Sequence, residues 1–422
     1  MAKKRDMLDD LIDIQSDWQA LQNPLGDVAN ALAEDPAKRK VFDPAEYKEK
    51  PFANSNRCLC TTAERDDVCT RCRDVCPTDS ITIHGKSVSI ADNCRKCGLC
   101  VSVCPTEAIG TRRHTPRQLY DQIARAASSY NQVYVTCTRA LKRLPKPNEI
   151  TLACVGCISR DLWFSLLADY TNVNVYLPLG ICDRCRTTTG EEFYSDAIAT
   201  AEEWAVSSVG LEVEDKALDH ELSREYKRSQ FMSGAVKSAE RLVTRSNGAL
   251  AGAQAVANKI SNHAKRLDQI QRELENAVGA KTTGNRQRML TQNRKLMMAA
   301  LQHEPRLARR IKLEVPACDP TLCTMCGDCV KVCPVRAIDL NNSGAIVVTP
   351  AYCVSCGACA KVCEDGALTM VPMDTQELVV PDKDAQMVAA QKAKAKAEAE
   401  KLMAQGKKSL NKAGDILEKL DK

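Results

Sequence analysis

The stretch CTMCGDCVKVCP, residues 323–334, spaces four cysteines as C-x2-C-x2-C-x3-C and follows them with a proline. The same spacing recurs in CRKCGLCVSVCP at 94–105 and in CVSCGACAKVCE at 353–364, where Glu364 replaces the proline. CTRCRDVCP at 69–77 has every position except the first cysteine. These four runs form two pairs near opposite ends of a chain of 422 residues and 23 cysteines.

This spacing predicts iron-sulfur ligation. Three closely spaced thiolates hold one 4Fe-4S cluster, and the fourth cysteine of the run reaches across to the neighbouring cluster. In the C-terminal pair, the two predicted ligand sets are Cys323, Cys326, Cys329 with Cys363, and Cys353, Cys356, Cys359 with Cys333. Zinc on paired CxxC groups would need neither the third cysteine nor the trailing proline. We therefore expect up to four 4Fe-4S clusters and a role in electron transfer.

The N-terminal pair leaves one ligand open. Its two predicted sets are Cys94, Cys97, Cys100 with Cys76, and Cys69, Cys72, Cys104 with a fourth ligand missing. Asp66 stands where the first cysteine of the run would be, and Cys58 and Cys60 lie a few residues before it. An aspartate there would leave a labile iron, whereas a cysteine from the preceding loop would keep the cluster whole. We favour a cysteine, and Cys58 by a narrow margin over Cys60.

The cysteine content indicates a reducing compartment. Disulfide scaffolds are expected in short secreted chains, and this chain is long. Its opening residues, MAKKRDMLDDLIDIQSDW, lack the continuous apolar core of a signal peptide. No stretch approaches the roughly 18 apolar residues of a membrane span. We expect a cytoplasmic protein, for which peripheral contact with a membrane surface stays open.

Composition and motif positions predict an α+β multi-domain fold. Two ferredoxin-like modules flank a small α/β parallel-sheet domain and a helical hairpin arm, which we expect to hold the modules apart. Each module has a predicted strand hairpin between its cysteine runs, so an internal duplication is the plain interpretation. The predicted boundaries are 1–56 for a polar leader, 57–114 and 314–376 for the modules, 115–216 for the α/β domain, 217–313 for the arm, and 377–422 for a Lys/Ala-rich helical tail.

The α/β domain carries cysteines of its own. Short β-branched runs at 133–135, 150–152 and 173–179 alternate with helical patterns at 160–170 and 191–207, which is typical of parallel βαβ units. Each predicted strand is followed by cysteine, and ligands gather at the carboxyl ends of parallel strands. The candidate metal ligands of this domain are Cys137, Cys154, Cys157, Cys182 and Cys185.

The arm is strongly basic and predicted to be helical. Apolar residues from Val236 to Leu267 follow a 3-4 spacing typical of a helical hairpin or coiled-coil seam, and GAKTTGN at 279–285 interrupts it. Residues 224–313 hold 19 Lys and Arg against 6 Asp and Glu. Such a surface suits nucleic acid, an anionic membrane or an acidic protein, or simply solvated helix faces. Aromatic residues make up only 4% of the chain, which argues against single-stranded nucleic acid.

Both modules resemble bacterial two-cluster ferredoxins. RCLC at 57–60 followed by CTRCRDVCP resembles a ferredoxin-type subgroup with an extended first loop. The middle segment, with VTC, LACVGC and LPLGICDRC, more weakly resembles the delta-type iron-sulfur subunit of methanogen hydrogenases that feed heterodisulfide reductase. That resemblance implies an α/β domain with a 2Fe-2S cluster. The CxxC spacings depart from that family, so zinc and metal-free buried thiols stay open as alternatives.

Together these features predict an electron-transfer protein without a substrate site of its own. No G-x-G-x-x-G follows a predicted strand and no P-loop is present, so nicotinamide, flavin and ATP sites lack support. We expect a polyferredoxin that acts as the relay subunit of a larger oxidoreductase and meets a redox partner or catalytic subunit. The alternative is a ferredoxin-type accessory or assembly factor, resembling those that accompany nitrate reductase and formate dehydrogenase.

Overall fold

The structure, a computed structural model, describes residues 41–227, 248–381 and 391. Most of the predicted leader, the first part of the predicted seam and nearly all of the predicted tail lie outside the described residues. The chain divides into two units, residues 1–378 and 379–422. Every contact discussed below lies within the first unit.

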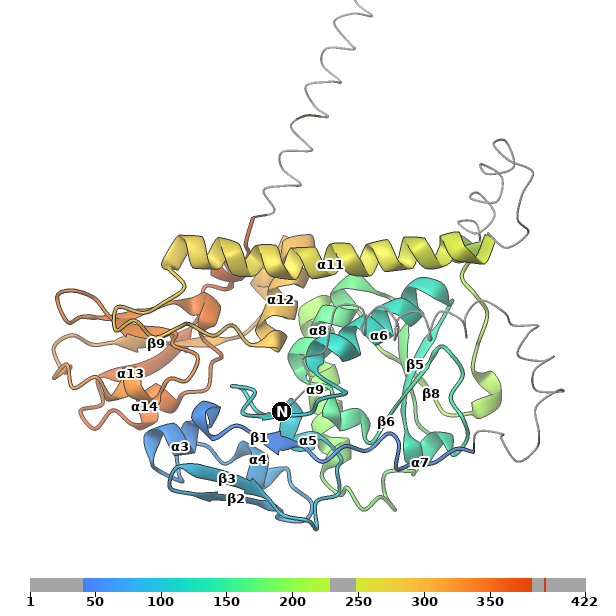
Figure 1. Ribbon diagram of the computed structural model, residues 1–422, viewed down its shortest axis with the longest axis horizontal. Coiled ribbons are helices and arrows are strands. Elements are labelled where there is room, and N and C mark those ends of the chain that lie inside the picture. Colours follow the sequence, from blue (N-terminus) through green and yellow to red (C-terminus); the bar gives the residue numbers. More distant parts are fainter. Residues whose placement is uncertain (1–40, 228–247, 382–390, 392–422) are drawn as a thin grey trace, which may run out of the picture. The chain divides into compact units, whose positions relative to one another are not determined.

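A four-stranded parallel sheet forms the centre of the middle domain (Figure 1). Its strands are β5 (Val133–Cys137), β6 (Glu149–Leu152), β7 (Val173–Tyr176) and β8 (Gly210–Glu212), in the order β6-β5-β7-β8. All three pairings are parallel, which confirms the predicted parallel sheet. β8 was not predicted, because three residues are too few for a recognisable strand pattern. The strand order reverses between β5 and β7, so the switch point lies where those two strands end.

Helices pack on this sheet and close its core. They are α6 (Pro116–Ser129), α7 (Thr138–Leu141), α8 (Arg160–Asp169) and α9 (Gly190–Ala205). α8 begins at Ser159, whose hydroxyl accepts a hydrogen bond from the Leu162 amide, the usual N-cap arrangement. α8 packs on α9, and Trp163, Phe164 and Trp204 are all at most 1% exposed. These large apolar side chains give the α/β domain a core that needs no metal.

The two ferredoxin-like modules share one order of elements, except that the N-terminal module has an additional helix, α3. The N-terminal module has β1 (Phe52–Ala53), α3 (Leu59–Ala63), α4 (Arg71–Asp74), β2 (Ile81–His84), β3 (Ser87–Ile90), α5 (Leu99–Ser102) and β4 (Ile109–Gly110). The C-terminal module has β9 (Glu314–Cys318), α13 (Asp328–Val332), β10 (Ile338–Leu340), β11 (Ile346–Val348), α14 (Ala358–Lys361) and β12 (Leu368–Pro372). In each, a central hairpin lies between the cysteine runs, and the last strand pairs with the first. Both predicted hairpins are confirmed; the duplication itself stays a prediction.

The modules contact each other directly, so the expectation that the α/β domain and arm hold them apart is wrong. α3 packs against α13. The Thr62 hydroxyl donates to the Val332 carbonyl at 3.1 Å, and the Lys361 ammonium donates to the Val68 carbonyl at 3.1 Å. Leu59 and Val332, each 2% exposed, belong to one apolar core shared by both modules. The sequence did not predict this contact, because the two modules lie far apart along the chain. The residues between them fold so that the second module lies against the first.

The described part of the arm contains α11 (Gly248–Val278) and α12 (Gln292–His303). The break predicted at 279–285 is confirmed, since α11 ends at Val278 and Gly279 has φ +81°. α11 contacts α12, as a hairpin predicts, but it also packs on α6 of the α/β domain. Leu267 and Ile270 are its most buried apolar side chains. The arm is therefore fixed to the body of the protein.

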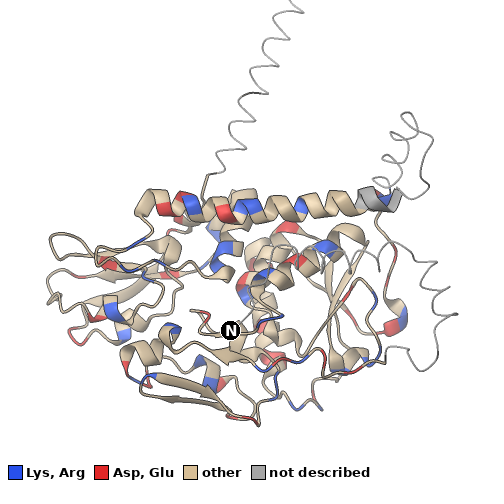
Figure 2. Ribbon diagram, viewed as in Figure 1, with Lys and Arg blue, Asp and Glu red and all other residues tan. Residues whose placement is uncertain are grey.

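Several cations of the basic arm make contacts inside the protein. Arg288 lies 3.5 Å from Asp339, Lys312 lies 2.6 Å from Glu203, and the Lys259 ammonium lies 4.5 Å from the centre of the Tyr170 ring. Figure 2 shows acidic residues interspersed with basic ones along α11. The excess of positive charge is thus partly used in contacts within the protein, some of them on its surface. Within the described residues, no helix combines the length and apolar character needed to cross a membrane.

Replacing Ile270 by alanine tests the docking of α11. Ile270 is fully buried, so Ile270→Ala should lower the free energy of opening of this helix by about 2 to 5 kcal/mol. Ile260→Ala is the matched control, because that side chain is half-buried on the same helix and should change the value by about 1 kcal/mol or less. Native-state hydrogen exchange of α11 amides measures both. Equal effects would contradict the described packing.

Candidate iron-sulfur sites

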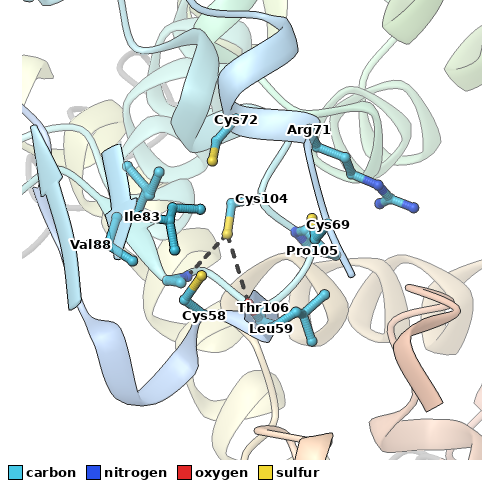
Figure 3. A pocket seen from close by; sticks show the side chains of 12 residues that line it. Cys58, Leu59, Cys69, Arg71, Cys72, Ile83, Val88, Cys104, Pro105 and Thr106 are labelled. Atoms are coloured by element: carbon cyan, nitrogen blue, oxygen red, sulfur yellow. Dashed lines mark hydrogen bonds between the residues drawn. The ribbon is translucent and has the colours of Figure 1, made fainter. Parts of the chain in front are cut away.

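Four cysteines line one cavity in the N-terminal module, which we call site A. They are Cys58, Cys69, Cys72 and Cys104. Figure 3 shows the sulfurs of Cys58, Cys72 and Cys104 turned toward one space, with the Arg71 side chain directed away from it. Apolar side chains complete the lining, among them Leu59, Ile83, Val88 and Ile109. The missing fourth position of the first cysteine run is thus filled in space by Cys58.

The other two candidates for that position lie elsewhere. Cys60 is fully buried, but its thiol donates to the Cys69 carbonyl at 3.0 Å rather than lining the cavity. Asp66 is exposed and does not line the cavity. Interaction with the neighbouring Cys60 side chain lowers the pKa of Cys58 to about 6, and the same interaction raises that of Cys60. Cys58 is therefore the thiol of this pair that loses its proton more readily.

Local chain geometry explains how Cys58 reaches site A. It caps the N-terminus of α3, the short helix inserted before the first cysteine run. The hydroxyl oxygens of Thr61 and Thr62 lie 3.0 and 2.9 Å from the Cys58 carbonyl oxygen. The helix ends at Glu64, which has a left-handed conformation with φ +54°. This extra turn brings a cysteine from outside the run to the position that Asp66 leaves empty.

A second group, site B, lies beside site A. Its members are Cys76, Cys94, Cys97 and Cys100, the set predicted from spacing. Burial raises the pKa of Cys100, and its neighbouring thiols include Cys72 of site A. Amide groups donate to two of the sulfurs, Ser80 to Cys76 at 3.3 Å and Lys96 to Cys94 at 3.4 Å. Sites A and B therefore have the adjacent arrangement expected in a two-cluster module.

The C-terminal module has two corresponding groups. Site D is a cavity lined by Cys333, Cys353, Cys356 and Cys359. Site C comprises Cys323, Cys326, Cys329 and Cys363, where burial and the neighbouring thiolates raise the pKa of Cys329 to about 11. The fourth cysteine of each run thus lies with the opposite run, as predicted. Cys318, which precedes this run in the chain, forms a hydrogen bond with Cys323 beside site C.

The four runs share a backbone conformation. The residue three places after the last cysteine has positive φ in each run: Asp79, Glu107, Arg336 and Gly366, at +48°, +51°, +58° and +63°. In the three complete runs a glycine in the left-handed region follows the second cysteine: Gly98, Gly327 and Gly357. Left-handed residues turn the chain tightly, so that amide groups face the enclosed sulfurs. The incomplete first run has a helix start, α4, at that point.

The donor chemistry of the sites fits iron-sulfur clusters. Burial, followed by repulsion from neighbouring thiolates, raises the pKa of Cys72 and of Cys356 to about 12. Buried thiolates of this kind need bound cations, and iron supplies them while displacing the thiol protons. Apolar walls and N–H···S hydrogen bonds are the features through which proteins set cluster potentials. The residues of sites A to D therefore match the group that their spacing predicts.

The cysteines of the α/β domain lie near its switch point. Cys137 ends β5, and the Cys182 sulfur, in the segment after β7, lies 3.8 Å from the Tyr194 hydroxyl. Cys154 and Cys157 lie toward site B, with Cys97 as a neighbour of each. In the part of the chain that the structure describes, no three His, Cys, Asp or Glu side chains are grouped to hold a single metal ion. A metal centre on Cys137, Cys154, Cys157, Cys182 and Cys185 stays a prediction.

Comparison with known protein families supports the cluster sites. Residues 322–368 match the 4Fe-4S dicluster domain, and residues 88–110 match the 4Fe-4S binding domain. The comparisons with curated proteins and with solved structures returned no match. The chain thus contains ferredoxin-type 4Fe-4S domains, which indicate an iron-sulfur protein of electron transfer. The matched segments include all the cysteines of sites C and D, three of the four cysteines of site B, and Cys104 of site A.

Substitution of Cys58 and of Cys60 separates the two candidates for site A. Cys58→Ser should remove between one and about four irons per chain, because it removes a cavity-lining sulfur. Cys60→Ser should keep the full iron content, because a serine hydroxyl still donates to the Cys69 carbonyl. Iron analysis with low-temperature EPR of anaerobic protein measures both. The reverse pattern would show that Cys60 is the ligand.

Proposed function

We propose that the protein is an electron relay with four 4Fe-4S clusters, at sites A to D, that serves as a subunit of a larger oxidoreductase. The direct packing of the two ferredoxin-like modules is the observation that carries this proposal. Two independent carriers would have no need to share an apolar core, whereas a relay needs its centres close together. Leu59 of one module and Val332 of the other lie in that shared core.

The contacts between sites support the order C–D–A–B. Sites C and D exchange their fourth cysteines within one module. Site D is joined to site A across the seam, where Arg71, between Cys69 and Cys72, is an electrostatic neighbour of Cys356. Lys361, beside Cys359, donates to the Val68 carbonyl next to Cys69. Site A is joined to site B through Cys72 and Cys100. Each step thus links loops that are already in contact.

The protein's own residues would exclude water from the clusters and hold them in place. The walls of sites A and D are largely apolar, with Ile83 and Val88 at site A and Val335 and Ile338 at site D. Bound clusters supply one-electron redox chemistry at such sites. The chain adds amide hydrogen bonds to sulfur, such as that from Ala108 to Cys104 at 3.2 Å. These contacts limit the rearrangement of the ligands when an electron arrives.

The surface beside site C has the character of a docking surface for a redox partner. Among the described cysteines, Cys326 is the one that is exposed. Beside it in the chain lie Leu322 at 50% and Met325 at 59% exposure. Exposed apolar residues grouped in this way are typical of protein contact surfaces. Electrons would enter or leave at site C. Site B faces the α/β domain instead, and there the Ser102 hydroxyl donates to the Gly156 carbonyl at 2.7 Å.

The alternative role, an accessory or assembly factor for a metalloenzyme such as nitrate reductase or formate dehydrogenase, stays a prediction. A stable stoichiometric complex with a catalytic subunit, isolated from anaerobic cells, favours the relay. Transient capture of a catalytic subunit that lacks its cofactor favours the factor.

Iron counting tests the relay proposal. We expect about 16 irons per chain, and EPR spectra of the dithionite-reduced protein with magnetic interaction between neighbouring clusters. A count below about eight would contradict the proposal, because at least two of the four sites would then be empty. Mössbauer spectra of the same sample distinguish iron in cubes from iron bound adventitiously.

A further inference from the structure

One arginine is buried directly behind site D. Arg294 of α12 is 2% exposed. Its guanidinium donates to the Cys353 carbonyl at 2.6 Å and contacts the Met297 sulfur at 3.3 Å, while Nε has no hydrogen-bond partner. Cys353 is one of the four cysteines that line site D. A guanidinium stays protonated under all ordinary conditions. The protein therefore encloses a full positive charge beside this site.

This buried charge lacks a counter-ion in the described protein. No carboxylate oxygen of the described residues lies within ion-pair distance of Arg294, since its described side-chain contacts are a carbonyl and a thioether. Asp161 has the largest electrostatic effect on Arg294 among groups of opposite sign, but Asp161 pairs with Arg160 at 3.2 Å. An unpaired buried charge costs several kcal/mol, so buried cations are normally found with an anion. We therefore expect a negatively charged group next to this guanidinium.

Four thiolates around site D supply that anion. A cube ligated by four cysteines has net negative charge, and its reduction adds one more. We propose that Arg294 is the counter-ion of the cluster at site D and raises the reduction potential of that cluster above those of the other three. The inference rests on the proposed function, because it needs a cluster at site D. It goes further than that function, because it states that Arg294 raises the reduction potential of the cluster at site D.

The other sites lack an equivalent charge. Among the described residues, the cysteine runs of sites A and B hold four basic side chains. Arg71, Arg95 and Lys96 are exposed, and Arg73 is half-buried with its guanidinium on the Asp66 carbonyl. Near site C, the Lys331 side chain is 69% exposed and pairs with Asp328 at 2.7 Å. Water and salt screen exposed or paired charges, whereas a desolvated charge acts at full strength. The cluster at site D, at the junction of the two modules, would therefore be the most readily reduced of the four.

Arg294→Met tests the proposal, because methionine has a similar length and no charge. In an EPR-monitored redox titration of the anaerobic holoprotein, the ratio of reduced to oxidised cluster at site D should fall at least tenfold at fixed potential. For a one-electron centre this corresponds to a shift of about −59 mV. The other three potentials should change far less. Arg294→Lys keeps the charge and should restore the potential.

Arg71→Met is the control for a screened charge. Arg71 is also an electrostatic neighbour of site D, through Cys356, but it is exposed, so its removal should change the ratio at that site less than about twofold.

Several outcomes would overturn the proposal. One is an unchanged site D potential in an Arg294→Met protein with full iron content. Another is loss of the cluster in both Arg294→Met and Arg294→Lys, which would assign the residue a packing role instead. Loss in Arg294→Met alone, with a normal Arg294→Lys protein, would support the need for charge. If the wild-type protein itself lacks the iron of site D, the relay proposal fails instead.

Discussion

Exchange of cysteines between paired cluster sites is the constraint on which the ferredoxin-like modules depend. The last cysteine of each run lies with the three cysteines of the other run in its module. Each pair of clusters would therefore connect the same two cysteine loops at two points. The strands of these modules are only two to five residues long, and much of their enclosed space is lined by cysteine and small apolar residues. Such short elements bury too little surface to hold the loops by packing alone. The metal would therefore supply folding free energy as well as redox chemistry.

The α/β domain is built on the opposite principle. Its sheet and helices enclose Trp163, Phe164 and Trp204, which bury a large apolar area without any metal. α12 extends this core toward the C-terminal module and carries Arg294 to the back of site D. The self-supporting domain can therefore hold the seam at which the two modules meet. Electron transfer across that seam would therefore depend on the packing of this domain as well as on the clusters.

Sequence spacing predicts the local ligand sets well, because a run of three cysteines closes around one cluster within a dozen residues. It also predicts the hairpins and the parallel sheet, whose patterns are local. It favours Cys58 over Cys60 only narrowly, because that choice depends on how α3 turns the chain into the cavity. The sequence also could not predict the contact between the two modules or the burial of Arg294. Both arise from contacts between residues tens to hundreds of positions apart, such as Thr62 with Val332 and Arg294 with Cys353.

The central claim is that bound clusters hold the two modules together while the α/β domain stands on its own core. Hydrogen exchange before and after anaerobic removal of iron with a chelator tests it most directly. The account predicts that amides at 81–90 and 338–348 lose their protection, whereas those of β5, β6 and β7 keep theirs. Retained protection throughout the modules, or its loss throughout the chain, would contradict it.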